Sequence, residues 1–167
     1  MTETSTPASA APPTTRLSPK MLYGALALAE MVTWALLILG MVLKYSGTSE
    51  AFVPIFGPIH GVVFIAYCVV TCFVWVNQRW SFGRGVAGLA SAVVPFCTIP
   101  FERSVERRGL LEGGWRLAAG GDRPRGPIEG IQALCLRHPV AAAFAGVAFV
   151  AVVTAVLLFL GPPVPKG

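Results

Sequence analysis

Four long apolar segments divide this chain, and each runs continuously instead of alternating with polar positions. They are Leu22 to Leu43, Ile59 to Val76, Val86 to Phe101 and Val140 to Leu160. Inside a bilayer every backbone polar group needs a partner within its own segment, so continuous apolar runs of this length predict membrane helices. The pattern therefore predicts an all-α protein, a polytopic transmembrane helical bundle with four membrane helices.

The third segment leaves two arrangements open, because it is short and contains Pro95 and Pro100. Its residues 86–101 would extend about 24 Å as a helix, less than the roughly 30 Å thickness of the hydrocarbon core. The segment either spans the bilayer with help from the long side chains of Arg84 and Arg103, or is re-entrant and returns to the side from which it came. A span is the preferred arrangement.

The positive charges give each arrangement its own orientation. If all four segments span, Arg16, Lys20, Arg79, Arg84 and Lys166 lie on one side and the other eight Lys and Arg lie opposite, which places the N-terminus outside. If the third segment is re-entrant, eleven of the 13 share the cytoplasmic side with the N-terminus, and only Lys44 and Lys166 lie outside. Both orientations stay open.

Composition excludes the soluble classes of protein. With 54% hydrophobic and 13% charged residues, a water-soluble fold of 167 residues would expose too much apolar surface. The net charge of +5 lies mostly in flanks and loops, where it suits anionic lipid headgroups. No nucleic-acid motif accompanies this charge. From the four apolar segments and the composition, we expect a multi-pass protein of the cell (plasma) membrane.

The organisation expected from these segments has five parts. Residues 1–20, rich in Ser, Thr, Ala and Pro, are expected to form a disordered N-terminal tail. A three-helix membrane core follows at 21–108, then a basic, Gly-rich connector on the membrane surface at 109–138, a fourth transmembrane helix at 139–160 and a C-terminal tail at 161–167. In the stretch from the end of the third segment to His138, the amphipathic piece FERSVERRGLL and the residues after Pro127 each predict a short helix.

Glu30 lies in the middle of the first apolar segment, where a carboxylate costs roughly 2.5 to 3.5 kcal/mol on insertion scales. It is expected to be protonated, paired or turned toward the protein interior. Polar residues recur from it at helical spacing. The first stripe is Glu30, Trp34, Leu37, Met41 and Lys44; the second is His60, Phe64, Tyr67 and Thr71; the third is Ser91, Pro95, Thr98 and Glu102.

These stripes should face one another, since lipid is the worse environment for polar groups. An antiparallel pairing of the first two segments would place His60 near Lys44 and Tyr67 near the depth of Glu30. A spanning third segment would bring Glu102 to the end where Lys44 and His60 lie. The candidate intramembrane polar or proton site therefore comprises Glu30, Lys44, His60, Tyr67 and Glu102.

Residues 16–108 carry a pattern that resembles a known family. Its elements are Ala29-Glu30, Leu43-Lys44-Tyr45, Gly57-Pro58-Ile59-His60-Gly61 with Tyr67, then Trp80, Pro95-Phe96 and Glu102-Arg103. This order is similar to the bacterial integral membrane family catalogued as domain of unknown function 3817. The sequence departs from the family at Met31 and Cys97, where the family typically carries Gly. The resemblance implies a three-helix membrane core and no particular activity.

No pattern of a catalytic, cofactor or metal site accompanies these stripes, so an enzyme is the least supported class and we expect no cofactor. Cys68, Cys72 and Cys97 lie in apolar surroundings with no metal-binding spacing. The first hypothesis is a membrane accessory or scaffold module, held on anionic lipid by its connector and acting as a homo-oligomer or with a partner membrane protein. The alternative is a small transporter-like or proton-coupled protein that uses Glu30.

Overall fold

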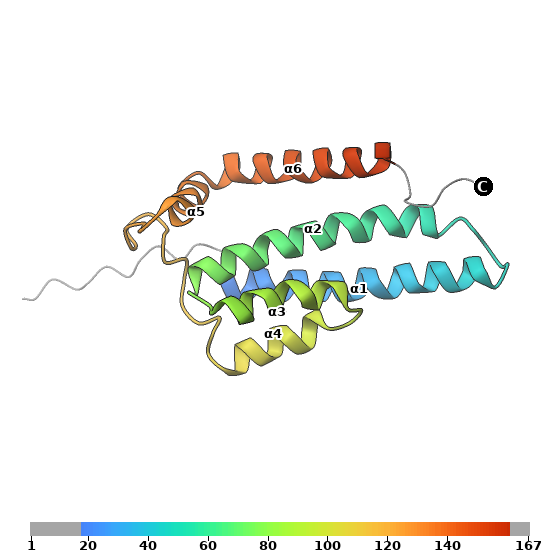
Figure 1. The fold of residues 1–167 in the computed structure, drawn as a ribbon, viewed down its shortest axis with the longest axis horizontal. Coiled ribbons are helices and arrows are strands. Elements are labelled where there is room, and N and C mark those ends of the chain that lie inside the picture. Colours follow the sequence, from blue (N-terminus) through green and yellow to red (C-terminus); the bar gives the residue numbers. More distant parts are fainter. Residues whose placement is uncertain (1–17, 161–167) are drawn as a thin grey trace, which may run out of the picture.

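The computed structural model describes residues 18–160 and contains six helices and no strand within them, which confirms the all-α prediction. The helices are α1 (Pro19–Tyr45), α2 (Val53–Asn77), α3 (Phe82–Val93), α4 (Thr98–Arg107), α5 (Pro127–Arg137) and α6 (Pro139–Leu160). The long helices α1, α2 and α6 run side by side, while α3 and α4 cover one half of the α1–α2 pair (Figure 1). Most of the predicted N-terminal tail and the whole C-terminal tail lie outside the described residues.

The first membrane helix begins earlier than its apolar segment does. Ser18 caps α1 by accepting a hydrogen bond from the backbone N–H of Met21 at 3.2 Å, and Pro19 occupies the first helical position. Proline suits that position because its missing N–H would have no helical partner there. The 27 residues of α1 extend about 40 Å, enough to cross the bilayer with some tilt.

Three helices in residues 18–160 are long and apolar enough to cross a membrane: Pro19–Tyr45, Val53–Asn77 and Pro139–Val156. The predicted count of four membrane helices is not confirmed, because the third apolar segment is split between α3 and α4. Val94 adopts an extended conformation before Pro95, as expected from the clash between a proline ring and a preceding helical residue. Phe96 then takes a positive φ of 64°, and the chain turns back.

The result is the α3–α4 hairpin, residues 82–107, whose two open ends lie at the same end of the bundle (Figure 1). Its 12-residue arm α3 extends only about 18 Å and reaches the middle of α1, where Trp34 Nε1 donates to the carbonyl of Ala92 at 3.1 Å. On the returning arm, Thr98 Oγ1 donates to the carbonyl of Ala27 at 3.0 Å. These bonds fix the hairpin tip beside the centre of α1.

Two glycines let α3 approach α2 closely. A Cβ atom on Gly85 would overlap the ring of Trp75, and one on Gly88 would lie 2.9 Å from Thr71 Cγ2. Small residues of this kind are the usual means of close helix packing in membranes. The core between the helices consists of Tyr23, Ala27, Tyr67, Val74, Trp80, Ala92, Val105 and Leu111.

Candidate functional site

The bundle interior holds two groups of polar side chains at different depths. The first, which we call the tyrosine cluster, consists of Tyr23, Tyr67 and Ser91 from α1, α2 and α3. The second, the Glu30 site, consists of Glu30 and Thr33 from α1 and His60 from α2. Each of these residues, taken with its backbone, is less than a tenth exposed.

In the tyrosine cluster every hydroxyl has a partner. The hydroxyls of Tyr23 and Tyr67 are 2.7 Å apart, and the Tyr67 hydroxyl lies 3.0 Å from Ser91 Oγ. Ser91 Oγ in turn donates to the carbonyl of Gly88 at 2.7 Å. The two tyrosine rings also stack with their centroids 5.4 Å apart. The cluster therefore joins three helices through bonds that lipid could not replace.

At the Glu30 site the carboxyl group is fully buried and neither oxygen makes a hydrogen bond. The nearest basic atom, His60 Nδ1, lies 3.7 Å from Oε2, which is too long for a hydrogen bond. His60 Nδ1 instead contacts Thr33 Oγ1 at 3.1 Å, and the Thr33 hydroxyl donates to the Glu30 backbone carbonyl at 3.1 Å. A buried carboxyl group without donors is most stable when it is uncharged or neutralised by a neighbour.

Aromatic rings surround the imidazole of His60. The ring centroid of Trp34 lies 4.5 Å away and that of Phe64 lies 6.2 Å away. Because the face of an indole attracts cations, the contact with Trp34 favours a positively charged imidazole over a neutral one. The site thus combines an acid, a base and a ring that stabilises the charged form of the base.

The predicted stripe on the second segment is confirmed, since His60, Tyr67 and Thr71 lie on the buried face of α2. The predicted depth of His60 is wrong, because it meets Glu30 and Thr33 and not Lys44. The cause is the start of α2 at Val53, six residues before the predicted start at Ile59. This extra length moves His60 almost two turns deeper, and Tyr67 correspondingly meets Tyr23.

Lys44 and Glu102 lie away from the Glu30 site. Lys44 is exposed near the C-terminal end of α1. Glu102 lies at the opposite end of α1, where a Cβ atom on Gly24 would be 3.4 Å from Glu102 Oε1. The expected meeting of Glu102 with the Lys44 and His60 end is therefore wrong, since the chain reverses at Phe96 and carries α4 back.

Sequence reasoning missed Thr33 and Tyr23, which complete the two interior groups. Tyr23 precedes Glu30 by seven residues and Thr33 follows it by three, so both belong to the same helical face. Extending the first stripe toward the N-terminus would have found Tyr23. Thr33 carried a weaker signal, because a threonine hydroxyl in a helix usually bonds its own backbone.

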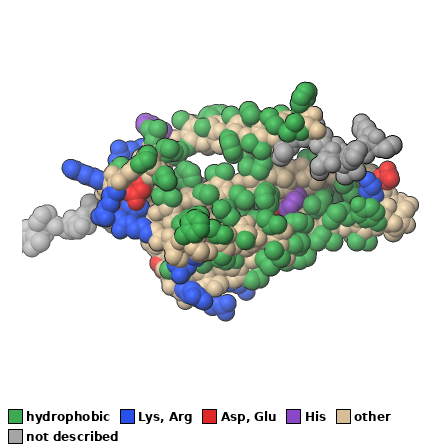
Figure 2. Space-filling view, in the orientation of Figure 1, with side chains coloured by type: hydrophobic (Ala, Val, Ile, Leu, Met, Phe, Trp, Pro, Cys, Tyr) green, Lys and Arg blue, Asp and Glu red, His purple; other side chains and the backbone are tan. Residues whose placement is uncertain are grey.

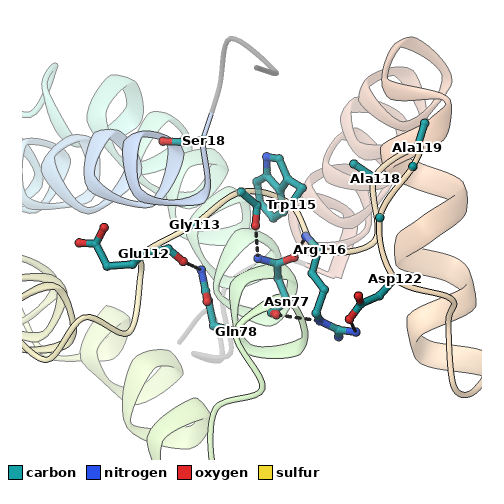
Figure 3. Close-up of a pocket in the computed structure, with 13 residues that line it drawn as sticks. Ser18, Asn77, Gln78, Glu112, Gly113, Trp115, Arg116, Ala118, Ala119 and Asp122 are labelled. Atoms are coloured by element: carbon teal, nitrogen blue, oxygen red, sulfur yellow. Dashed lines mark hydrogen bonds and ion pairs between the residues drawn. The ribbon is translucent and has the colours of Figure 1, made fainter. Parts of the chain in front are cut away.

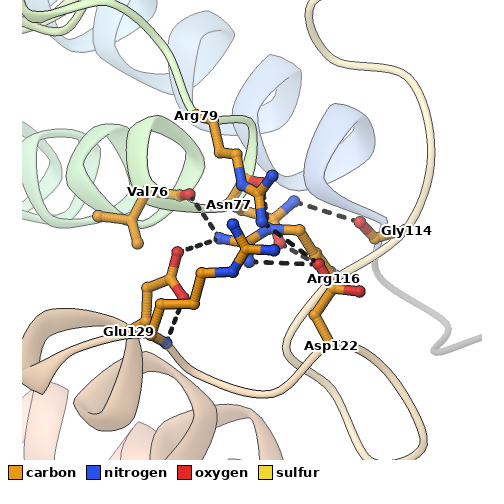
Figure 4. Close-up of polar contacts among 8 residues, drawn as sticks. Val76, Asn77, Arg79, Gly114, Arg116, Asp122 and Glu129 are labelled. Carbon is orange, nitrogen blue, oxygen red and sulfur yellow. Dashed lines mark hydrogen bonds and ion pairs between the residues drawn. The ribbon is translucent and has the colours of Figure 1, made fainter.

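The connector is attached to the end of α2 mainly through Arg116. Its guanidinium donates to the carbonyls of Val76 and Asn77, both at 3.2 Å, and to Glu129 Oε1 at 2.8 Å (Figure 4). The bond to Asn77 satisfies a carbonyl of the kind that the end of a helix leaves without a partner, whereas the Val76 carbonyl also accepts from the backbone N–H of Arg79 at 3.3 Å. Arg116, together with the backbone N–H of Arg125, holds the pKa of Glu129 below its usual value. Arg116 therefore faces the protein interior and not the lipid headgroups.

A cavity of about 750 Å³ lies between this connector and the ends of α1 and α2 (Figure 3). Its lining includes Asn77 and Gln78 together with Glu112, Arg116 and Asp122. Asp122 lies 3.4 Å from Arg116 Nη1 and 3.5 Å from Arg79 Nη2. The charged residues of the lining are Glu112, Arg116 and Asp122, and Asp122 is paired with Arg116.

The basic residues gather at one end of the bundle, around α5 and the open end of the α3–α4 hairpin (Figure 2). Among residues 18–160, Lys44 is the one Lys or Arg at the other end. On the face shown in Figure 2, the surface between the two ends is largely hydrophobic. This partition is the one expected for a re-entrant third segment.

Comparison with known proteins gives boundaries close to those of α1 to α4. The family described as Domain of unknown function (DUF3817) matches residues 21–107, which confirms the resemblance seen in the sequence. "Putative membrane protein SCO5905" of Streptomyces coelicolor is 44% identical over 88 residues, 52% of this chain and 10% of that protein. "Uncharacterized membrane protein YdzA" of Bacillus subtilis is 33% identical over 70 residues, 42% of this chain and 73% of that protein. No solved structure matches.

Proposed function

This chain belongs to the DUF3817 family, and from that premise we propose that it is a membrane accessory module, a small bundle that supports a partner membrane protein. The observation that carries the proposal is the use of the same segment in chains of very different length. The matched segment is about a tenth of the Streptomyces relative and about three quarters of the Bacillus relative. A segment that occurs both in a much longer protein and almost alone is suited to an accessory role.

The interior of the bundle also supports this role. The tyrosine cluster is satisfied by bonds among α1, α2 and α3, and Glu30 is completely enclosed. These features favour a rigid support over a pathway for a solute, which needs groups open to water. Since α5 and α6 lie beyond the matched segment, they are the parts of the described chain that would adapt it to its own partner.

Photo-crosslinking in cells tests this assignment. A photoreactive residue at Val147, 69% exposed on α6, should give a discrete protein product, because a partner helix would pack there. The matched position is Leu39, 51% exposed on α1, which should face lipid and give none. Products at neither position, or equally at both, would contradict a partner contact through α6.

For the orientation we propose a multi-pass protein of the cell membrane with its N-terminus in the cytoplasm. The gathering of Lys and Arg at the α5 end supports this, since cytoplasmic loops carry the excess of positive charge. In a chain without its own cysteines, single cysteines at Lys20, Phe82 and Gly120 should be labelled from the cytoplasmic side. A cysteine at Glu50 should be labelled from outside. Labelling of positions 82 and 120 from opposite sides would restore a spanning third segment.

A proton-coupled role is the second candidate, and the unpartnered carboxyl group of Glu30 beside His60 favours it. Glu30→Gln distinguishes the two functions, because an amide keeps the size of the acid and cannot ionise. In cells lacking the gene, full complementation by the Gln variant would exclude proton coupling. Normal amounts of Gln variant in the membrane with no complementation would instead exclude a purely structural accessory role.

A further inference from the structure

The two contacts of the Thr33 hydroxyl favour hydrogen on one nitrogen of His60. Thr33 Oγ1 lies 3.1 Å from both the Glu30 carbonyl and His60 Nδ1, but the hydroxyl has one proton to donate. A carbonyl can only accept, so both contacts are hydrogen bonds at once only when the hydroxyl proton points to the Glu30 carbonyl. The contact with His60 is then a hydrogen bond only if Nδ1 carries hydrogen and donates it to Thr33 Oγ1.

With hydrogen on Nδ1, a neutral imidazole keeps its lone pair on Nε2. That nitrogen makes no hydrogen bond within residues 18–160, yet it is not among the enclosed atoms without partners, which are both Glu30 oxygens and Oε1 of Gln132. Nε2 therefore reaches the surface of the bundle, consistent with the 11% exposure of the His60 side chain. Glu30, at 0%, has no such access.

The surroundings of the site favour the uptake of one proton. A Glu30 carboxylate beside a neutral His60 would leave an uncompensated charge in the bilayer, and one added proton makes the pair neutral overall. On the side of α1, the indole of Trp34 stabilises an imidazolium. Besides His60, the ionisable side chain of α2 that interacts with Glu30 is the Cys68 thiol, and the α3–α4 hairpin has no charged residue between Arg84 and Glu102. No competing cation therefore faces the pair from these elements.

We propose that His60 is the entrance of a buried proton site: a proton adds to Nε2 from outside the bundle, and Glu30 balances the charge of the imidazolium. The donor is a hydronium ion, whose O–H bond breaks as the N–H bond forms and which leaves as water, and no bond within the protein breaks. Thr33 is a positioning residue, which acts by holding the Nδ1 hydrogen toward itself and Glu30. This inference goes beyond the accessory role and does not depend on it.

Nitrogen NMR of the full chain in lipid vesicles tests the proposal, because the two neutral tautomers and the imidazolium give distinct ring-nitrogen shifts. The chain has two histidines, and His138→Gln assigns the signals of His60. At high pH, His60 should be the Nδ1–H tautomer, and lowering the pH from about 8 to about 5 should convert it to the imidazolium. A neutral Nε2–H tautomer, or an imidazole that takes no proton over this range, would overturn the proposal.

The role of Thr33 is tested by removing its hydroxyl. Thr33→Val should lower the ratio of the Nδ1–H to the Nε2–H tautomer by roughly two- to tenfold, the effect of one hydrogen bond. Thr33→Ser should restore the wild-type ratio. The matched control is Thr71→Val, since Thr71 is also buried and donates at 2.7 Å to the carbonyl of Tyr67, away from His60. An unchanged ratio in Thr33→Val, or an equal change in Thr71→Val, would show that Thr33 does not position His60.

Discussion

The tyrosine cluster and the Glu30 site lie two turns apart on the same face of α1, but they differ in the hydrogen bonding of their polar atoms. Every hydroxyl of the tyrosine cluster is bonded, and the cluster ties together three helices. The Glu30 carboxyl group is buried as deeply and has no hydrogen bond. In lipid, a polar group with a structural role typically has all its hydrogen bonds made. A buried polar group without a hydrogen-bond partner is instead typical of one that changes its protonation state.

The largest effect is expected where the α3–α4 hairpin, which supplies Ser91, packs against α2. Gly85→Val should destabilise the protein by about 1–3 kcal/mol or more, because the new side chain would overlap the ring of Trp75. Gly83→Val is the matched control on the same helix, since a side chain there meets no atom within 4 Å. The free energy of unfolding in detergent measures both. Equal effects at the two glycines would show that α3 does not approach α2 as described.

A smaller loss is expected within the tyrosine cluster. Tyr67→Phe removes the hydroxyl that joins Tyr23 to Ser91 and should cost about 1–2 kcal/mol of unfolding free energy. Tyr45→Phe serves as the control, because Tyr45 is 82% exposed at the end of α1. If the Tyr67→Phe protein were as stable as the control, the hydrogen bonds of the tyrosine cluster would not stabilise the fold.

The smallest change is expected at Glu30 itself. Because the carboxyl group makes no hydrogen bond, Glu30→Leu should leave the unfolding free energy within about 0.5 kcal/mol of wild type or raise it. Thermal unfolding in detergent at neutral pH measures this. A loss above about 1 kcal/mol, the usual worth of an interhelical hydrogen bond, would mean that Glu30 is bonded as the tyrosines are.

The sequence was informative where helical periodicity applies. The buried face of α2 and the short helix after Pro127 follow directly from the spacing of apolar and polar residues. For the third segment, the sequence indicated a break in the helix but not the direction of the chain after it. Pro95 predicted an interruption of the helix. Whether a proline kinks a helix or reverses the chain depends on the next residues, here on the positive φ of Phe96.

The depth at which the polar residues meet was beyond sequence reasoning. It depends on where α2 begins, and the residues from Val53 to Pro58 contain two prolines that suggest a loop. Proline at the start of a helix is tolerated, and Pro58 is accommodated within α2, so the helix extends farther than its apolar run. An error of six residues at one helix start was enough to exchange Lys44 for Glu30 as the neighbour of His60.

The α3–α4 hairpin returns to the end that it left, so it covers only one half of the length of the long helices (Figure 1). In a bilayer crossed by α1, α2 and α6, one leaflet would hold parts of these helices together with both arms of the hairpin, and the other would hold the three long helices alone. A body of this wedge shape displaces more lipid from one leaflet than from the other, and bending of the bilayer relieves that imbalance. The protein is therefore expected to accumulate where the membrane curves so as to give the hairpin leaflet more room.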